Sequence, residues 1–132
     1  MNARPLIRQG AMVRPARDGD GLMAFLDPSA MSADAASVIT PANLAGGLIV
    51  RSGATANRID TTDTAVAILA ANPEMDIGES FCVIVTNQVA FTITIAGGTG
   101  VTASGNLVIA ANGWKILMFT KTSATTMTVV GL

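Results

Sequence analysis

Residues 81–95, FCVIVTNQVAFTITI, carry the clearest structural signal in this sequence. The first six residues strongly favour β-structure, and the Asn87–Gln88 pair that follows can turn the chain. Further on, apolar residues at 91, 93 and 95 alternate with threonines at 92 and 94. A period of two is typical of a strand with one buried face. The stretch therefore predicts two strands joined by a turn, the second over residues 89–95 with a threonine face.

The same pattern continues to residue 132. Short strands are predicted at residues 107–109, 114–119 and 126–130. The glycine-rich segment 97–100 predicts a hairpin turn, and Asn112–Gly113 is the strongest hairpin signal in the chain. The predicted fold class is therefore mainly β, an antiparallel β-sandwich or jelly-roll-like meander.

Upstream of residue 81, one short helix and two further strands are expected. Residues 65–71, AVAILAA, favour a helix, and the Asp and Thr residues before them can cap it. Asn72–Pro73 should end it. Residues 47–51 predict a strand. Residues 37–40 predict a second strand, whose pairing is limited by the following Pro41.

Residues 1–35 differ from the rest and are predicted to form an extended N-terminal arm. Prolines and Asp-Gly pairs interrupt them without a sustained period, and only residues 22–26, LMAFL, are apolar enough to dock. We expect an arm over residues 1–35 and a β-rich, oligomerising domain over residues 36–132. The arm residues expected to contact a protein partner are Arg4, Arg8, Arg14, Arg17, Leu22 and Phe25.

The net charge of −1 conceals an uneven distribution. Residues 1–17 carry four Arg and no acid, residues 18–79 carry all nine acids against two Arg, and residues 80–132 carry only two Lys. Since interface cores are depleted of charge, so charge-poor a β region is expected to be buried in an oligomer. An arm that contacts an acidic protein surface is favoured over nucleic-acid binding, because aromatic residues make up only 4%.

The sequence points away from enzymatic chemistry. It contains no His and no Tyr, and its single Cys82 lies in an apolar run, where a small buried side chain is expected. Residues 98–103 match GxGxxA, but no helix is predicted after them and no acid follows, so no dinucleotide site is expected. Asp18–Gly21 lacks the acid that would complete a calcium loop. Glu74, Asp76 and Glu79 are interpreted as solvated loop acids. We expect no catalytic residue, cofactor, metal ion or small-molecule substrate.

Neither a signal peptide nor a membrane span is expected. Residues 1–10 contain no apolar core of the kind that secretion signals require. The unbroken apolar runs are only a few residues long, whereas a membrane helix needs about 20.

Residues 60–132 resemble a known class of proteins. The resemblance rests on residues 64–69, 78–87, 91–102, 110–113 and 121–129, which carry recurring Thr, Gly and Ala patterns. Together they are similar to small β-rich structural proteins of tailed bacteriophages, especially capsid decoration (cement) proteins. The resemblance implies a homotrimer on the outer surface of the virion capsid, made in the host cytoplasm and bound to the major capsid protein. Phe91, Trp114 and Phe119 are expected in the core or at the contact between subunits.

Two alternatives remain open at this level. The chain could be a tail, fibre or spike component involved in host-surface binding, which would favour an exposed aromatic sugar site. It could also be an unrelated soluble oligomer, such as a bacterial surface or binding module.

Overall fold

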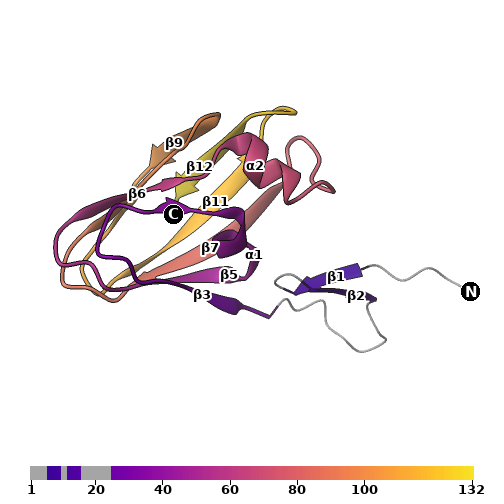
Figure 1. Ribbon diagram of the computed structural model, residues 1–132. Helices are drawn as coiled ribbons and strands as arrows, with labels where there is room; N and C mark the ends of the chain where they lie inside the picture. The colour runs from indigo at the N-terminus through magenta and orange to yellow at the C-terminus, as the bar shows by residue number, and fades with distance from the viewer. Residues whose placement is uncertain (1–5, 10–11, 16–24) are drawn as a thin grey trace, which may run out of the picture.

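Two β-sheets packed face to face form the body of this computed structural model, which describes residues 6–9, 12–15 and 25–132 (Figure 1). The larger sheet has the order β3-β5-β7-β11-β12-β9 and the smaller one β10-β8-β6-β4. The strands of the larger sheet are β3 Asp27–Met31, β5 Gly47–Arg51, β7 Ser80–Asn87, β9 Val101–Gly105, β11 Trp114–Lys121 and β12 Met127–Gly131. Those of the smaller sheet are β4 Val38–Ile39, β6 Arg58–Thr62, β8 Ile93–Ala96 and β10 Val108–Ile109. The expected mainly β class is confirmed.

The chain crosses between the two sheets at nearly every turn. From β3 to β11, successive strands belong alternately to the larger and the smaller sheet, and only β11 and β12 form a hairpin within the body. The successive windings place β3, β5 and β7 parallel in one sheet, and β4, β6 and β8 parallel in the other. The expected antiparallel meander is therefore wrong, and the jelly-roll-like order is not borne out: both sheets are mixed.

Two of the hairpin predictions fail for the same reason. Asn112 has a φ of 55°, so the chain does turn there, but the turn joins β10 of one sheet to β11 of the other. The turn at residues 97–100 likewise joins β8 to β9 across the two sheets. A tight turn reverses the chain in either case, and hydrogen bonds to distant strands decide which sheet receives the next strand.

Two short helices, instead of the single one expected, return the chain from the smaller sheet to the larger. Helix α2, Ala65–Ala70, follows the prediction, and the side chain of Thr64 accepts a hydrogen bond from the amide of Ala67 at 3.1 Å. Helix α1, Pro41–Ala45, was missed. Pro41 begins it, and Thr40 and Asn43 form a reciprocal capping box, so the proline that seemed to limit a strand is a helix start.

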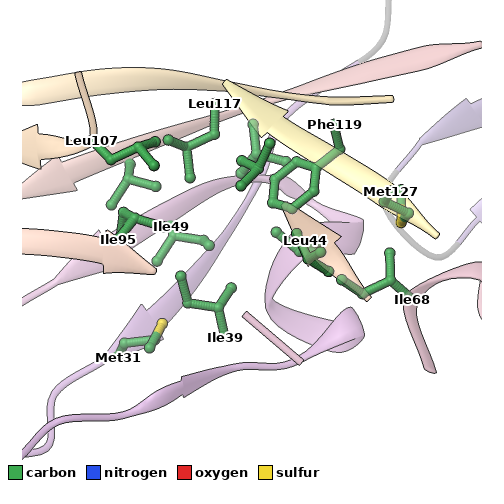
Figure 2. Close-up of a cluster of buried hydrophobic side chains, with 14 of the residues drawn as sticks. Met31, Ile39, Leu44, Ile49, Ile68, Ile95, Leu107, Leu117, Phe119 and Met127 are labelled. Atoms are coloured by element: carbon green, nitrogen blue, oxygen red, sulfur yellow. The ribbon is translucent and has the colours of Figure 1, made fainter. Parts of the chain in front are cut away.

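The apolar core lies between the sheets and under the helices. Phe119 of β11 is fully buried there, and its ring stacks on that of Phe81 with centroids 5.1 Å apart. Figure 2 shows side chains of both sheets meeting those of α1 and α2. The fully buried members include Ile39, Ile49, Ile68, Ile93, Ile109, Leu117, Met127 and Val129. One continuous core explains why strands so mixed in direction form a single unit.

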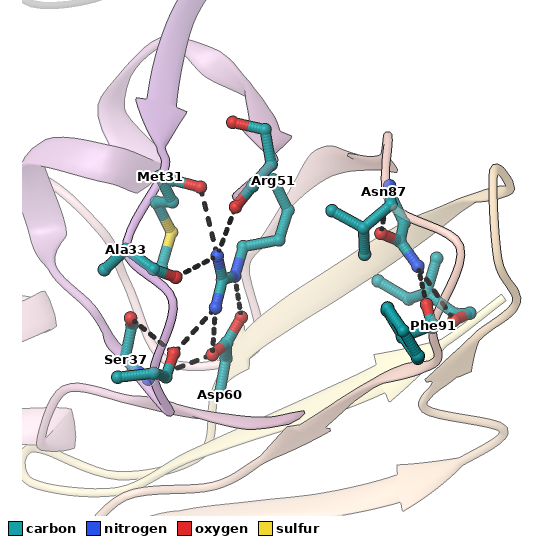
Figure 3. Close-up of polar contacts among 11 residues, drawn as sticks. Met31, Ala33, Ser37, Arg51, Asp60, Asn87 and Phe91 are labelled. Atoms are coloured by element: carbon teal, nitrogen blue, oxygen red, sulfur yellow. Dashed lines mark hydrogen bonds and ion pairs between the residues drawn. The ribbon is translucent and has the colours of Figure 1, made fainter. Parts of the chain in front are cut away.

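A buried polar cluster closes the end of the sandwich where the chain leaves the larger sheet (Figure 3). Arg51 is inaccessible to solvent, and its Nε lies 2.7 Å from Oδ2 of Asp60, which is 1% exposed. The same guanidinium donates hydrogen bonds to the carbonyls of Ala33 and Ala35, at 2.8 and 2.7 Å. The loop between β3 and β4 is thus held by an arginine that the sequence pattern did not single out.

The segment Asp27–Met31, which was expected in the N-terminal arm, is part of the sandwich. Strand β3 pairs in parallel with β5 from Asp27 to Met31, so these residues belong to the larger sheet. Before them, β1 Leu6–Gln9 and β2 Met12–Pro15 form a separate antiparallel pair (Figure 1). No helix in the described part of the chain is long and apolar enough to span a membrane.

Candidate assembly surface

The outer face of the larger sheet carries no charged side chain. Because neighbouring side chains in a strand point to opposite faces, the burial alternation and strand register identify the outward residues. On β7 and β11 the inward residues include Val83, Val85, Leu117 and Phe119. The outward set is Pro28, Ala30, Leu48, Val50, Ser80, Cys82, Ile84, Thr86, Thr102, Ser104, Trp114, Ile116, Met118, Thr120, Thr128 and Val130.

These outward residues form rows across the strands. Leu48, Ile84 and Ile116 face one another in register on β5, β7 and β11. A second row begins with Cys82 and Met118 and ends with Val130 on β12. Large apolar side chains therefore occupy the centre of the face, where residues side by side on adjacent strands touch.

A row of hydroxyl groups borders the apolar centre. It runs from Ser80 on β7 through Thr120 on β11 to Thr128 on β12 and Thr102 on β9. The hydroxyls of Ser80 and Thr120 lie 2.6 Å apart and hydrogen-bond to each other. The face is thus polar on one side without carrying charge.

The three expected packing residues are found in different environments. Phe119 is buried in the core. Trp114 is 65% exposed at the start of β11 on the outer face, so it does not pack in the core of its own chain. Phe91 lies in the loop before β8 and is 38% exposed. The alternation of β11 explains the difference, because positions 114 and 119 have opposite parity.

Cys82 corrects another expectation. It is exposed, whereas the sequence suggested a small buried side chain. The apolar run 81–85 made every position look internal, but Val83 and Val85 point inward and Cys82 therefore points outward between them. Its free thiol is therefore accessible on the outer face of the larger sheet.

Most residues expected to contact a partner lie at or beyond the edge of the described structure. Arg4, Arg17 and Leu22 lie outside the described residues, as does the Asp18–Gly21 segment. Arg8 is a residue of strand β1, and Arg14 is a residue of strand β2. Phe25 is 60% exposed and lines a shallow pocket of about 210 Å³ with Leu26, Leu44 of α1 and Phe81 of β7. The pocket gives the base of the arm an apolar site beside the sandwich.

The outer face of the smaller sheet is narrower and less apolar. Its outward residues are Val38, Ile59, Thr61, Thr94, Ala96 and Val108. Ile59 is 58% exposed and faces Thr94 across the strands. This face combines threonine and short apolar side chains, without the continuous rows of the larger sheet.

The residues considered above as ligand-binding or catalytic candidates make contacts that hold turns and loops. The amide of Gly98 donates to Thr62 Oγ1 at 2.9 Å, and a side chain at this position would overlap the carbonyl oxygens of Thr62 and Asp63. Asp76 and Glu79 form a local loop contact, in which the carboxylate of Glu79 accepts from the amide of Asp76 at 2.6 Å. Within the described ranges, no three His, Cys, Asp or Glu residues are grouped as metal ligands.

The pKa of the Asp34 carboxyl departs clearly from its ordinary value. Hydrogen bonds from the Thr55 hydroxyl at 2.6 Å and from Arg58 at 2.8 Å stabilise the ionised form and lower the pKa of Asp34. The carboxylate lies in an exposed loop contact and joins the β3–β4 and β5–β6 loops. It therefore helps to hold two loops together.

Comparisons with known proteins give no match. No protein-family model matches the chain. No curated protein and no solved structure matches it either.

Proposed function

We propose that this chain is a structural protein of a bacteriophage virion that decorates the outer surface of the assembled capsid. The observation that supports an assembling subunit is the uncharged, largely apolar outer face of the larger sheet. A surface designed for a solitary domain would carry roughly 25–35% charged residues. The resemblance of residues 60–132 to phage decoration proteins indicates the kind of assembly.

In this proposal the β-body forms a homo-oligomer and the N-terminal region binds the major capsid protein. Arg4, Arg8, Arg14, Arg17 and the apolar residues Leu22 and Phe25 make the capsid contact. A protein that binds the assembled shell but not its separated subunits stabilises the shell by mass action. Many identical copies would reinforce the head against the pressure of the packaged DNA without catalysis, cofactor or nucleic-acid contact.

Immunogold labelling of particles from a phage lysate tests the location. Gold spread over the heads is the expected result, with an antibody shown beforehand to bind the folded protein. Labelling restricted to tails, or no labelling, would contradict decoration of the capsid.

A deletion of residues 1–21 tests the role of the arm. The shortened chain should keep the oligomeric state of the full chain, since the described body begins later, but should no longer bind purified shells. Shell binding that survives the deletion would show that the arm is not the contact.

One observation favours a second candidate, a tail, fibre or spike component. Sugar-binding sites commonly expose an aromatic ring, and Trp114 is 65% exposed. Its position at the start of β11 would let the indole stack on a sugar. Quenching of Trp114 fluorescence by host-surface glycans would favour this candidate, and labelling of tails in the same lysate would agree with it.

A further inference from the structure

We propose that the outer face of the larger sheet is the surface through which one copy of this chain binds a second copy. The inference deepens the proposed function, which supplies its biological setting, but the surface itself is argued from the structure. Its centre is the row of Leu48, Ile84 and Ile116, flanked by Met118 and Val130.

The chemistry of the face suits a copy of itself. Burying a charge in an interface is costly unless a partner neutralises it, and two copies of this face would bring no charge into contact. Apolar rows from one copy would meet apolar rows from the other. Ser80 and Thr120 already hydrogen-bond each other, and that hydrogen bond would be kept when the face is buried.

The size of the face also agrees with a protein partner. Strands β7 and β11 have 8 residues each, which gives a length of about 26 Å at roughly 3.3 Å per residue. Six strands spaced by about 4.8 Å give a width of about 29 Å. Since the outer strands are shorter, the area in projection is about 600 Å², close to the roughly 800 Å² of accessible surface that each partner buries in a standard interface.

A single extended segment does not match these dimensions. Such a segment covers about the width of two strands, roughly 10 Å, and would leave most of the apolar face in water. A second sheet, packed at the usual spacing of about 10 Å, covers the whole face at once. The second copy is therefore favoured over the N-terminal arm as the occupant.

The decisive variant is Ile116→Lys, with Ile59→Lys as the matched control. Both change an outward isoleucine to lysine on a β-strand, the first on the larger sheet and the second on the smaller sheet. By analytical ultracentrifugation, the full chain and Ile59→Lys should self-associate equally. Ile116→Lys should associate at least about 100-fold more weakly, as expected for a residue at the centre of an interface. Far-UV circular dichroism should show that both variants are folded.

The thiol of Cys82 provides a second readout that needs no variant. Cys82 is the only cysteine of the chain and lies on the proposed interface. In the full chain its rate of alkylation by a maleimide should fall at least about tenfold when the protein concentration is raised into the associated range. A chain lacking residues 1–24 should show the same protection.

Several outcomes would overturn the inference. These are a full chain that stays monomeric, association of Ile116→Lys equal to that of the full chain, and dissociation caused by Ile59→Lys alone. Loss of association and of thiol protection on removing residues 1–24 would point to the arm as the occupant instead. A non-associating chain that still labels phage heads would refute this inference and the oligomer of the proposed function, but not the capsid location. An associating chain absent from particles would refute only the proposed function.

Discussion

Replacing Arg51 by methionine should remove a large part of the folding free energy. The guanidinium is inaccessible, its Nε lies 2.7 Å from Oδ2 of Asp60, and Asp60 is itself 1% exposed. Methionine preserves much of the side-chain length and removes the charge. The carboxylate would then stay buried, with the amide of Ser37 at 3.0 Å as its remaining donor among the contacts described.

The structure sets the size of this effect. Removing one partner of a buried ion pair costs about 3–5 kcal/mol, because the other charge is left without compensation. A domain of this size is stable by about 5–15 kcal/mol, so the loss is a fifth of the total at the least. The double variant Arg51→Met/Asp60→Leu should cost less than the two single changes added together, by about 2 kcal/mol or more, since no buried charge remains.

Urea unfolding followed by far-UV circular dichroism measures both quantities. All variants should be compared at one protein concentration, because self-association raises apparent stability. The matched control is Arg58→Met, which breaks a second Arg–Asp pair of similar length, 2.8 Å to Asp34, whose side chains are 27% and 46% exposed. That variant should unfold close to the full chain. Loss below about 1 kcal/mol for Arg51→Met, or strict additivity in the double variant, would refute the reasoning.

Three further predictions concern other contacts. Asn87→Ala should lower the free energy of unfolding by about 2–3 kcal/mol in the same urea assay, because the buried side-chain amide of Asn87 donates to the carbonyls of Phe91 and Ala110 at 2.7 and 3.1 Å. A change below about 0.5 kcal/mol would contradict this. Gly98→Ala should cost about 1–3 kcal/mol, because its methyl group would overlap the backbone oxygens of Thr62 and Asp63; an unchanged urea midpoint would show that the turn relaxes freely. The pKa of Asp34 is lowered on folding, so its contacts stabilise the protein above the ordinary value of 3.8 and lose that effect as the pH falls through the folded pKa. Between pH 6 and pH 3 the urea midpoint should therefore decrease more for the full chain than for Asp34→Asn. Equal decreases would contradict the role given to the Asp34 carboxylate.

Local sequence pattern identified most of the elements near where they lie. The expected strands over residues 47–51, 81–86 and 114–119 correspond to β5, β7 and β11, and the helix at residues 65–71 to α2. The prediction over residues 89–95 was too long, since β8 covers Ile93–Ala96. Strands β3 and β9 were missed because aspartate, proline, serine, alanine and glycine, which are weak strand formers, make up most of them. Strand β6 was missed because its Asp and Thr residues were interpreted as caps of the following helix. Each of these strands is held by pairing with a neighbour distant in sequence.

The candidate site was only partly visible in the sequence. Low charge after residue 80 indicated a surface suited to assembly, and Trp114 was placed at the core or at a contact between subunits. Which face of the sheet each residue occupies could be known only from the folded structure. Trp114 and Cys82 point outward because their positions in the strand are of opposite parity to those of Phe119 and Val83, which are buried. A run of consecutive apolar residues hides that parity.

What the sequence by itself determined is the β-rich class, the helix of residues 65–70, the turn at Asn112 and the concentration of charge before residue 80. These follow from properties of adjacent residues: strand propensity, capping, permitted backbone angles and composition. Tertiary structure alone decided that successive strands cross between two sheets, that Arg51 and Asp60 pair in the interior, and that one broad face is left without charge. The reason is that a turn of given sequence reverses the chain equally well into a hairpin or into the opposite sheet. The choice between them is made by hydrogen bonds and packing between residues far apart in the chain.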